Sequence, residues 1–126
     1  MPHMELRYSR NLEDHTDVQA LCEAVAEMMR NDPMFVPGGI RVRAVPVDAY
    51  VIADGDARNA FLDMVLRIGS GRTDGAKKAT GEKLFNGVVE HLSVLFMQPY
   101  FALSFELLEI DAELSWKKNS IHSRLR

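Results

Sequence analysis

Pro2 is the residue whose chemistry depends most on its place in the chain. When the initiator methionine is removed, which a small second residue generally permits, Pro2 becomes the N-terminal residue and carries a secondary amine. Burial among apolar side chains disfavours the charged ammonium, so the pKa of this amine falls toward neutrality. Such an amine can act as a general base at neutral pH. Many chains begin Met-Pro without using the proline, so this hypothesis depends on the neighbours of Pro2 in space.

Two arginines supply the expected neighbours. Arg41 stands at the start of one predicted strand, and Arg72 stands where another strand gives way to a helix. Both can therefore lie at the end of the sheet that holds Pro2. Guanidinium groups bind carboxylates bidentately, so two of them around a basic amine suit a small dicarboxylate whose enol proton must move. Either arginine alone would more often be a surface residue, and we interpret the remaining arginines in that way.

Other kinds of site find little support in the sequence. The four histidines are scattered, and no cluster of Cys, Asp or Glu has metal-ligand spacing. The Gly69-Ser70-Gly71 stretch lacks the Gly-Lys-Ser/Thr ending of a P-loop and the third glycine of a dinucleotide fingerprint. The single cysteine, Cys22, lies on the apolar side of a predicted helix, which favours a structural, inert thiol.

Composition bounds the class of protein. The chain of 126 residues, 47% hydrophobic and 26% charged, fits one globular domain, 1–126. The net charge of -3 and the dispersed basic residues argue against nucleic acid as a partner. No window approaches the roughly 18 apolar residues of a membrane span, so no membrane partner is expected. One cysteine excludes an internal disulfide and fits a cytoplasmic location.

The first half of the chain predicts a strand, a helix and a second strand. Residues 2–9 alternate apolar and polar side chains, as a half-buried strand does. Apolar residues recur at helical spacing over 17–30, with Thr16 or Asp17 as the cap. After a loop rich in Pro and Gly, residues 40–45 alternate again and place Arg41 and Arg43 on one face. Pro46 predicts that the chain leaves the sheet there or follows its edge.

The second half repeats this pattern. Strands are predicted over 61–68 and 101–110, separated by a long helix over 73–96. Residues 114–125 form a short C-terminal extension, which we expect to be β-structure. The predicted fold class is α+β: two β-α-β units, about 1–57 and 58–126, form one four-stranded mixed sheet covered by two helices. Each helical crossover should make its two strands parallel.

Several stretches carry a family resemblance. Pro2-His3, Gly39 to Arg43, Ala53-Asp54-Gly55, Leu66 to Arg72, Leu103 to Glu106 and Trp116 to His122 resemble 5-carboxymethyl-2-hydroxymuconate isomerase, in order and at the right spacings. Gly71-Arg72-Thr73-Asp74, which leads into the second helix, also resembles the short subunit of 4-oxalocrotonate tautomerase. The resemblance spans essentially the whole chain and implies the tautomerase fold.

The resemblance also implies a mechanism and a setting. It makes Pro2 the catalytic base and Arg41 and Arg72 the substrate-binding residues, which are the three residues reached above. It implies a homotrimer that uses no cofactor and no metal, acts on a small dicarboxylate or tricarboxylate, and serves bacterial aromatic catabolism through homoprotocatechuate degradation. The implied reaction converts a 2-hydroxydienoate to its conjugated 2-oxo isomer.

Two alternatives remain open at this point. Other proline-dependent activities of the same superfamily, such as a phenylpyruvate-type tautomerase, a hydratase or a decarboxylase, share the base and differ in the pocket lining. If Met1 is retained, the nitrogen of Pro2 is an amide and is not basic, and the chain would then be a non-catalytic oligomeric binding protein.

Overall fold

A four-stranded sheet forms the frame of the molecule. The computed structural model describes residues 1–125. Its strands are β1 (His3–Ser9), β2 (Arg41–Val47), β3 (Ala60–Gly69) and β4 (Phe101–Ile110), in the order β2-β1-β3-β4. The pairs β1·β2 and β3·β4 are parallel, whereas β1 and β3 are antiparallel. The predicted pair of strand-helix-strand units and the mixed sheet are confirmed.

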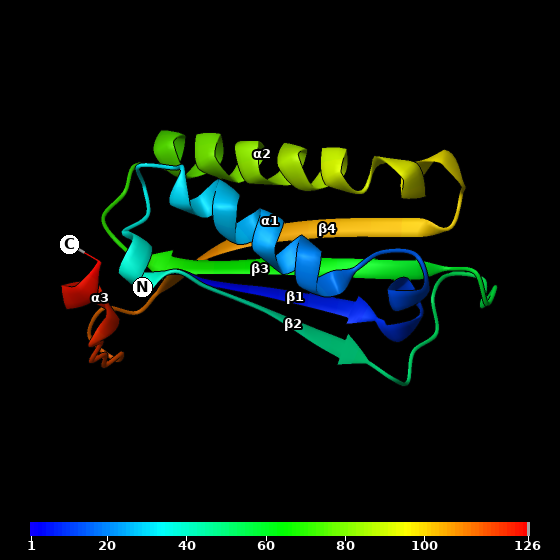
Figure 1. Ribbon diagram of the computed structural model, residues 1–126, viewed down its shortest axis with the longest axis horizontal. Helices are drawn as coiled ribbons and strands as arrows, with labels where there is room; N and C mark the ends of the chain where they lie inside the picture. The colour runs from blue at the N-terminus through cyan, green and yellow to red at the C-terminus, as the bar shows by residue number, and fades with distance from the viewer. Residues whose placement is uncertain (126) are drawn as a thin grey trace.

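Two helices cover one face of this sheet (Figure 1). Helix α1 (Val18–Arg30) starts at Asp17, whose side chain accepts a hydrogen bond from the Ala20 amide. Helix α2 (Asp74–His91) starts at Thr73, which caps the Ala76 amide in the same way. These caps satisfy backbone donors that have no partner within the helix, and the predicted cap at Asp17 is confirmed.

The long second helix ends earlier than predicted. Regular α-helix stops at His91, and Ser93–Met97 forms the 3-10 helix η3 instead of continuing to residue 96. The apolar side chains that hold α2 to the sheet end at Leu92, which is buried, whereas Val94 and Met97 are largely exposed. Without a buried face to extend, the chain turns back toward β4.

The core lies between the helices and the sheet. Alternation along β1 buries Met4 and Leu6 against α1 and α2, while His3 and Glu5 point to the opposite face. The same alternation buries the even-numbered side chains of β3. Each such apolar side chain contributes about 1.5–3 kcal/mol of transfer free energy, and a register slip of one residue would expose the whole set. The register between β1 and its neighbours is therefore fixed.

Strand β2 lies at one edge of the sheet, which explains its proline. Pro46 lies within β2, opposite Tyr8 of β1. An edge strand needs a ladder donor on one side only, so the missing N–H is tolerated there. The prediction that Pro46 marks an edge is confirmed, as is the shared face of Arg41 and Arg43, which lie opposite His3 and Glu5.

The C-terminal extension is not β-structure, so that prediction was wrong. After β4 the chain runs without strand pairing and ends in the one-turn helix α3 (Ile121–Arg124). Its residues 115–120 are mostly polar and lack the alternation that a strand needs to bury one face. The segment is held instead by side-chain contacts with the 3-10 turn η2 (Pro37–Gly39).

Candidate active site

Pro2 lies at the end of the sheet where β1 and β2 begin and β3 ends. Its side chain is buried, and its carbonyl oxygen accepts a hydrogen bond of 3.2 Å from the Arg41 amide. The parallel pairing of β1 and β2 therefore fixes Arg41 beside Pro2. In Figure 1 the N-terminus, η2 and α3 gather at this same end.

The structure brings Pro2, Arg41 and Arg72 to one end of the sheet. Arg41 opens β2 and its Nη2 donates to Met1 Sδ at 3.1 Å. Arg72 follows β3, and its guanidinium donates to the carbonyl oxygens of Gly69 (3.0 Å) and Met34 (3.1 Å). These two bonds use two of its five N–H groups and fix the plane of the fork. Within residues 1–125 neither arginine has a carboxylate at salt-bridge distance.

Two cavities adjoin the N-terminal residues. One, of about 280 Å³, is lined by Pro2, Arg72 and His122, with Phe35 and Ile68 as apolar wall. The other, of about 390 Å³, is lined by residues that include His3, Arg41, Arg67 and Trp116. Met1, Gly69, Ser70 and Lys117 line both. The combination of an apolar wall and a few convergent cations suits a small organic anion.

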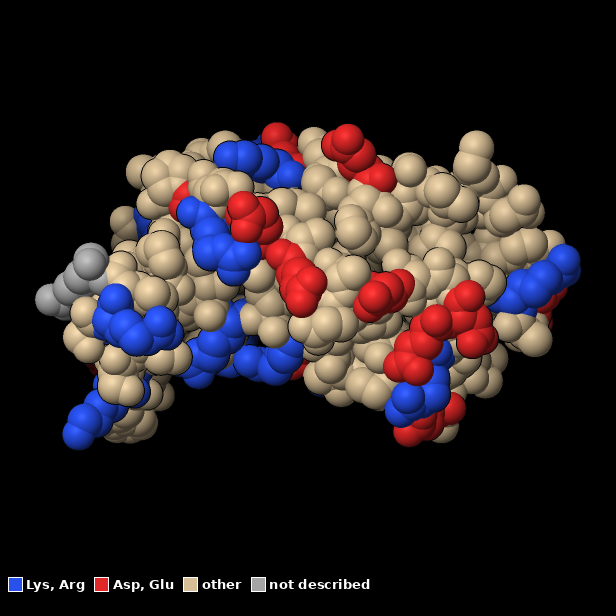
Figure 2. Space-filling view, in the orientation of Figure 1, with Lys and Arg blue, Asp and Glu red and all other residues tan. Residues whose placement is uncertain are grey.

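The charges at this end act on the N-terminal amine. Burial lowers the pKa of the Met1 amine from its ordinary value of 8.0, and the positive charges of Lys117, Arg41 and Arg72 lower it further, in that order. Figure 2 shows lysine and arginine side chains gathered at this end of the molecule. The same surroundings would act on an amine at Pro2, which is the more buried of the two residues. The surroundings thus favour an unprotonated amine at the N-terminus.

His3 is a neutral histidine within this cationic group. Burial lowers the pKa of its imidazole to about 4, helped by the positive charges of Arg41, Arg67 and Arg43 and by the N-terminal amine. Strand pairing places His3 directly between Arg41 on β2 and Arg67 on β3. A second positive charge there would be repelled from both sides, so the ring stays uncharged near neutrality.

The part of the chain that the structure describes shows no grouped metal ligands, and its single cysteine is half-buried. Residues 1–125 contain no group of three or more His, Cys, Asp or Glu side chains that could hold a metal ion. Cys22 is half-buried against the core, and burial raises the pKa of its thiol. A thiol with a raised pKa is a poor nucleophile, which agrees with the structural role predicted for Cys22.

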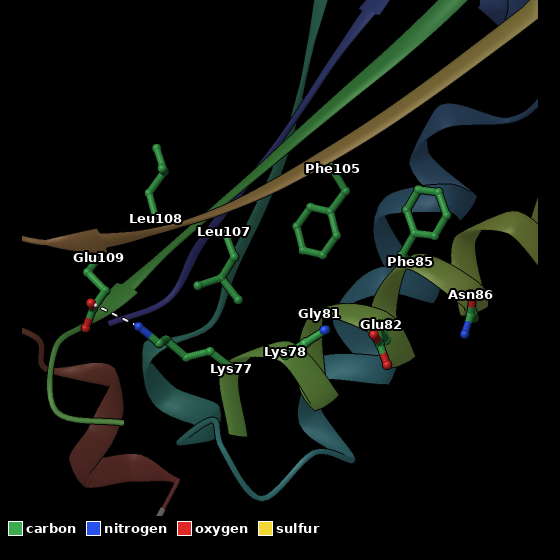
Figure 3. A pocket seen from close by; sticks show the side chains of 10 residues that line it. All are labelled: Lys77, Lys78, Gly81, Glu82, Phe85, Asn86, Phe105, Leu107, Leu108 and Glu109. Atoms are coloured by element: carbon green, nitrogen blue, oxygen red, sulfur yellow. Dashed lines mark hydrogen bonds and ion pairs between the residues drawn. The ribbon is translucent and has the colours of Figure 1, made fainter. Parts of the chain in front are cut away.

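A larger cavity than these two lies elsewhere in the molecule. It measures about 560 Å³ and lies between α2 and β4, with Phe85, Phe105 and Leu107 on its apolar side (Figure 3). Lys77 on its rim is paired, since Lys77 Nζ contacts Glu109 at 3.1 Å and Asp74 at 3.2 Å. It shares no lining residue with the cavity that holds Pro2. Size alone therefore does not mark the candidate site.

Sequence reasoning missed several residues of this site. His3 was set aside with the other histidines, and Arg67 was taken for a surface residue, yet both line the second cavity. Lys117 and His122 were noticed only as part of a family-like stretch. Strand alternation could have flagged His3 and Arg67, whereas no local pattern reveals that residues 117–122 return to Pro2.

Comparison with known proteins first defines the class. Solved structures with less than 25% sequence identity share the fold: a member of the cis-3-chloroacrylic acid dehalogenase family aligns with a TM-score of 0.65 over 91% of this chain and 79% of the other. A fused 4-OT symmetric trimer aligns with a TM-score of 0.60 over 85% of each chain. The fold is the tautomerase fold.

Closer relatives then give the family. The family model described as 5-carboxymethyl-2-hydroxymuconate isomerase matches residues 2–125. The 5-carboxymethyl-2-hydroxymuconate Delta-isomerase of Escherichia coli is 33% identical over 98% of this chain and 98% of its own length. The crystal structure of a 5-carboxymethyl-2-hydroxymuconate isomerase from Deinococcus radiodurans R1 aligns at 36% identity with a TM-score of 0.91, over 99% of this chain and 94% of the other. The chain belongs to the 5-carboxymethyl-2-hydroxymuconate isomerase family, and its enzyme class is isomerase.

Proposed function

We propose that this protein, with Pro2 as its N-terminal residue, is a cofactor-independent keto-enol isomerase of 2-hydroxydienoates, with 5-carboxymethyl-2-hydroxymuconate as the leading substrate. One observation carries the proposal: Pro2 lines a cavity beside the cations of Arg72 and Lys117, with Arg41 in the adjoining cavity. The relatives named for this activity support the choice of substrate.

The chemistry needs one mobile proton. The Pro2 nitrogen takes the proton of the 2-hydroxy group, the C2–O bond becomes a carbonyl, the C2=C3 double bond moves to C3=C4, and the electron pair of the former C4=C5 double bond becomes available to bind a proton at C5. The secondary ammonium then gives the same proton to C5, where a new C–H bond forms. The product is the conjugated 2-oxo isomer, and the amine is regenerated. A positioned base contributes about 100- to 10,000-fold to such a reaction.

Arg41 and Arg72 would stabilise the anion that forms between the two proton transfers. Each guanidinium can bind a carboxylate with two parallel hydrogen bonds, and the positive charge lowers the energy of the dienolate. Arg72 enters this role with its plane already fixed by the Gly69 and Met34 carbonyls, so little reorganisation is needed. Phe35 and Ile68 would pack against the conjugated carbon chain.

Assembly and location form part of the same proposal. We infer a homotrimer, since two distant structural neighbours are described as symmetric trimers and since Trp116 and Leu114 leave 86% and 72% of their surface exposed. Among residues 1–125 no helix combines the length and the apolar character that crossing a membrane requires. With its one cysteine, the chain fits a cytoplasmic enzyme.

One competing function depends on whether Met1 is removed. Met1 Sδ accepts hydrogen bonds from Arg41 and from Asn119 Nδ2 (3.2 Å), and Met1 lines both cavities. With Met1 in place the nitrogen of Pro2 is an amide, so no proton transfer through it is possible. A protein that keeps Met1 in its own cells would be a non-catalytic binding protein with the same fold.

The deciding experiment combines mass and activity. The intact mass of the protein from its native cells reports whether Met1 is lost, and ultraviolet absorbance follows ketonisation of 5-carboxymethyl-2-hydroxymuconate. Loss of Met1 with turnover that falls at least about 100-fold in Pro2→Ala is the expected result. Phenylpyruvate enol serves as the comparison substrate. A mature protein that retains Met1 and turns over neither compound would contradict the proposal.

A further inference from the structure

The C-terminal segment is docked beside Pro2 by defined contacts. Asn119 Nδ2 donates to the Gly38 carbonyl at 2.8 Å. His122 lies against Gly38 and Gly39, and a Cβ atom at Gly38 would come within 2.7 Å of its Nδ1 and 2.8 Å of its Cα. Only glycine leaves room for this approach. The segment between β4 and α3 is therefore held over the end of the sheet at a fixed place.

This anchor puts Lys117 at the boundary of the two cavities. Lys117 lines the cavity that contains Pro2 and Arg72, and it also lines the cavity that contains Arg41. It is exposed, and within residues 1–125 its ammonium has no carboxylate at salt-bridge distance. Its neighbour Lys118 lines neither cavity. The chain thus offers two adjacent lysines with different surroundings.

Lys117 is also close enough to act on the amine. After burial, its positive charge is the largest cause of the lowered pKa of the Met1 amine, ahead of Arg41 and Arg72. Three cations that repel one another across a small space would all be stabilised by an anion placed among them. A substrate with more than two carboxylates would supply one carboxylate for each cation.

We propose that Lys117 binds a carboxylate that lies away from the reacting 2-hydroxy group, and so makes the site select substrates with a third carboxylate. This inference rests on the proposed function. The rigid forks of Arg41 and Arg72 suit the carboxylates at the ends of a planar conjugated chain. A flexible lysine stem with a compact ammonium suits a carboxylate on a rotatable methylene, such as a carboxymethyl group.

The test compares two dienols that differ in this group alone. Lys117→Met is assayed with 5-carboxymethyl-2-hydroxymuconate and with 2-hydroxymuconate, and Lys118→Met is the matched control. The assays are run at a pH where the amine is unprotonated in every variant, so that loss of the Lys117 charge does not change the base. For Lys117→Met we then expect kcat/KM to fall about 10- to 100-fold on the first substrate, mostly through KM, and less than about threefold on the second. Lys117→Arg should restore most of the loss. Lys118→Met should resemble the wild type on both substrates.

Two outcomes would overturn the assignment. An equal fall on both substrates would make Lys117 a general electrostatic group, and unchanged kinetics would remove it from the site. If the wild type turns over neither dienol, the proposed function fails, and binding then tests Lys117 separately. Calorimetry with propane-1,2,3-tricarboxylate and glutarate should show a preference for the tricarboxylate that Lys117→Met loses; no preference in the wild type, or the same one in both proteins, would contradict the inference.

Discussion

The two ends of the sheet have similar architecture and different chemistry. At one end β1 and β2 begin and β3 ends; at the other β3 and β4 begin and β1 ends. Each end carries a cavity, of about 280 Å³ beside Pro2 and about 350 Å³ beside Arg58 and Tyr100. The repeated strand-helix-strand unit thus supplies a cavity twice.

What differs is the state of the charges. Arg58 is paired with Asp56 at 2.7 Å and stacks on the Tyr100 ring at 4.1 Å, so its charge is already neutralised. Among residues 1–125, Arg72 bonds only to carbonyl oxygens and keeps its charge available to a ligand. The first end also has a chain terminus, whereas the second is crossed by continuous chain. Each end of the sheet carries a cavity, and the cations beside Pro2, which have no carboxylate at salt-bridge distance within residues 1–125, make the first end the candidate site that we propose.

The largest effect should come from removing the amine at Pro2, so that the first end of the sheet, like the second, has no basic amine. Pro2→Leu keeps Met1, because a large second residue blocks its removal, and the base is then an amide. We expect turnover of the dienol to fall at least about 100-fold, the contribution of a positioned base. Intact mass confirms that Met1 is kept, and circular dichroism confirms the fold. Turnover near the wild-type level in this variant would show that the amine is not the base.

A paired experiment on the two arginines follows. Arg72→Ala should lower kcat/KM about 100- to 1,000-fold, because it removes a preorganised donor for the developing negative charge. Arg58→Ala, at the other end, should change kcat/KM less than threefold, since its charge is used by Asp56 and Tyr100. Steady-state kinetics on both variants decides the matter. Similar losses would mean that the two ends do not differ as described.

A substitution at Gly38, against which His122 packs, should disturb the docking of the C-terminal segment. Gly38→Ala places a methyl group against the backbone of His122, and overpacking of this kind typically costs about 1–3 kcal/mol. We expect the segment to move away with Lys117, which should raise KM for the carboxymethyl substrate about tenfold. Gly75→Ala in α2 is the control, because nothing lies within 4 Å of its new Cβ. An unchanged KM in Gly38→Ala would show that the segment does not shape the site.

The smallest effect concerns stability and pH. The pKa of His3 is lowered to about 4 from its ordinary 6.5. Between these two pH values the unfolded chain therefore binds a proton that the folded protein does not bind. The contribution of neutral His3 is fully present above pH 6.5 and is lost as the pH falls toward 4, by about 1 kcal/mol after allowance for partial exposure. Urea unfolding of wild type and His3→Gln between pH 7 and 4 measures it. The variant should show a shallower loss; parallel curves would rule out this role for His3.

Local patterns predicted most of the frame. Alternation found β1, β3 and β4 within one or two residues of their observed ends, and helical spacing with the Asp17 cap found α1. These predictions succeeded because each strand or helix buries one face, and the spacing of apolar residues along the sequence shows which face it is. The end of α2 and the form of residues 114–125 were mispredicted, since Leu92 and the docking of His122 depend on distant partners.

The sequence by itself determined the family, the alternation that fixes the sheet register, and the types of residue available for chemistry: a proline at the second position and arginines at strand ends. Only the tertiary structure decided which cations face the amine. It brings Lys117 across more than a hundred residues to Met1, sets His3 between Arg41 and Arg67, and neutralises Arg58 at the opposite end. The physical reason is that electrostatic and steric contacts depend on distance in space, whereas the sequence gives only the separation of residues along the chain.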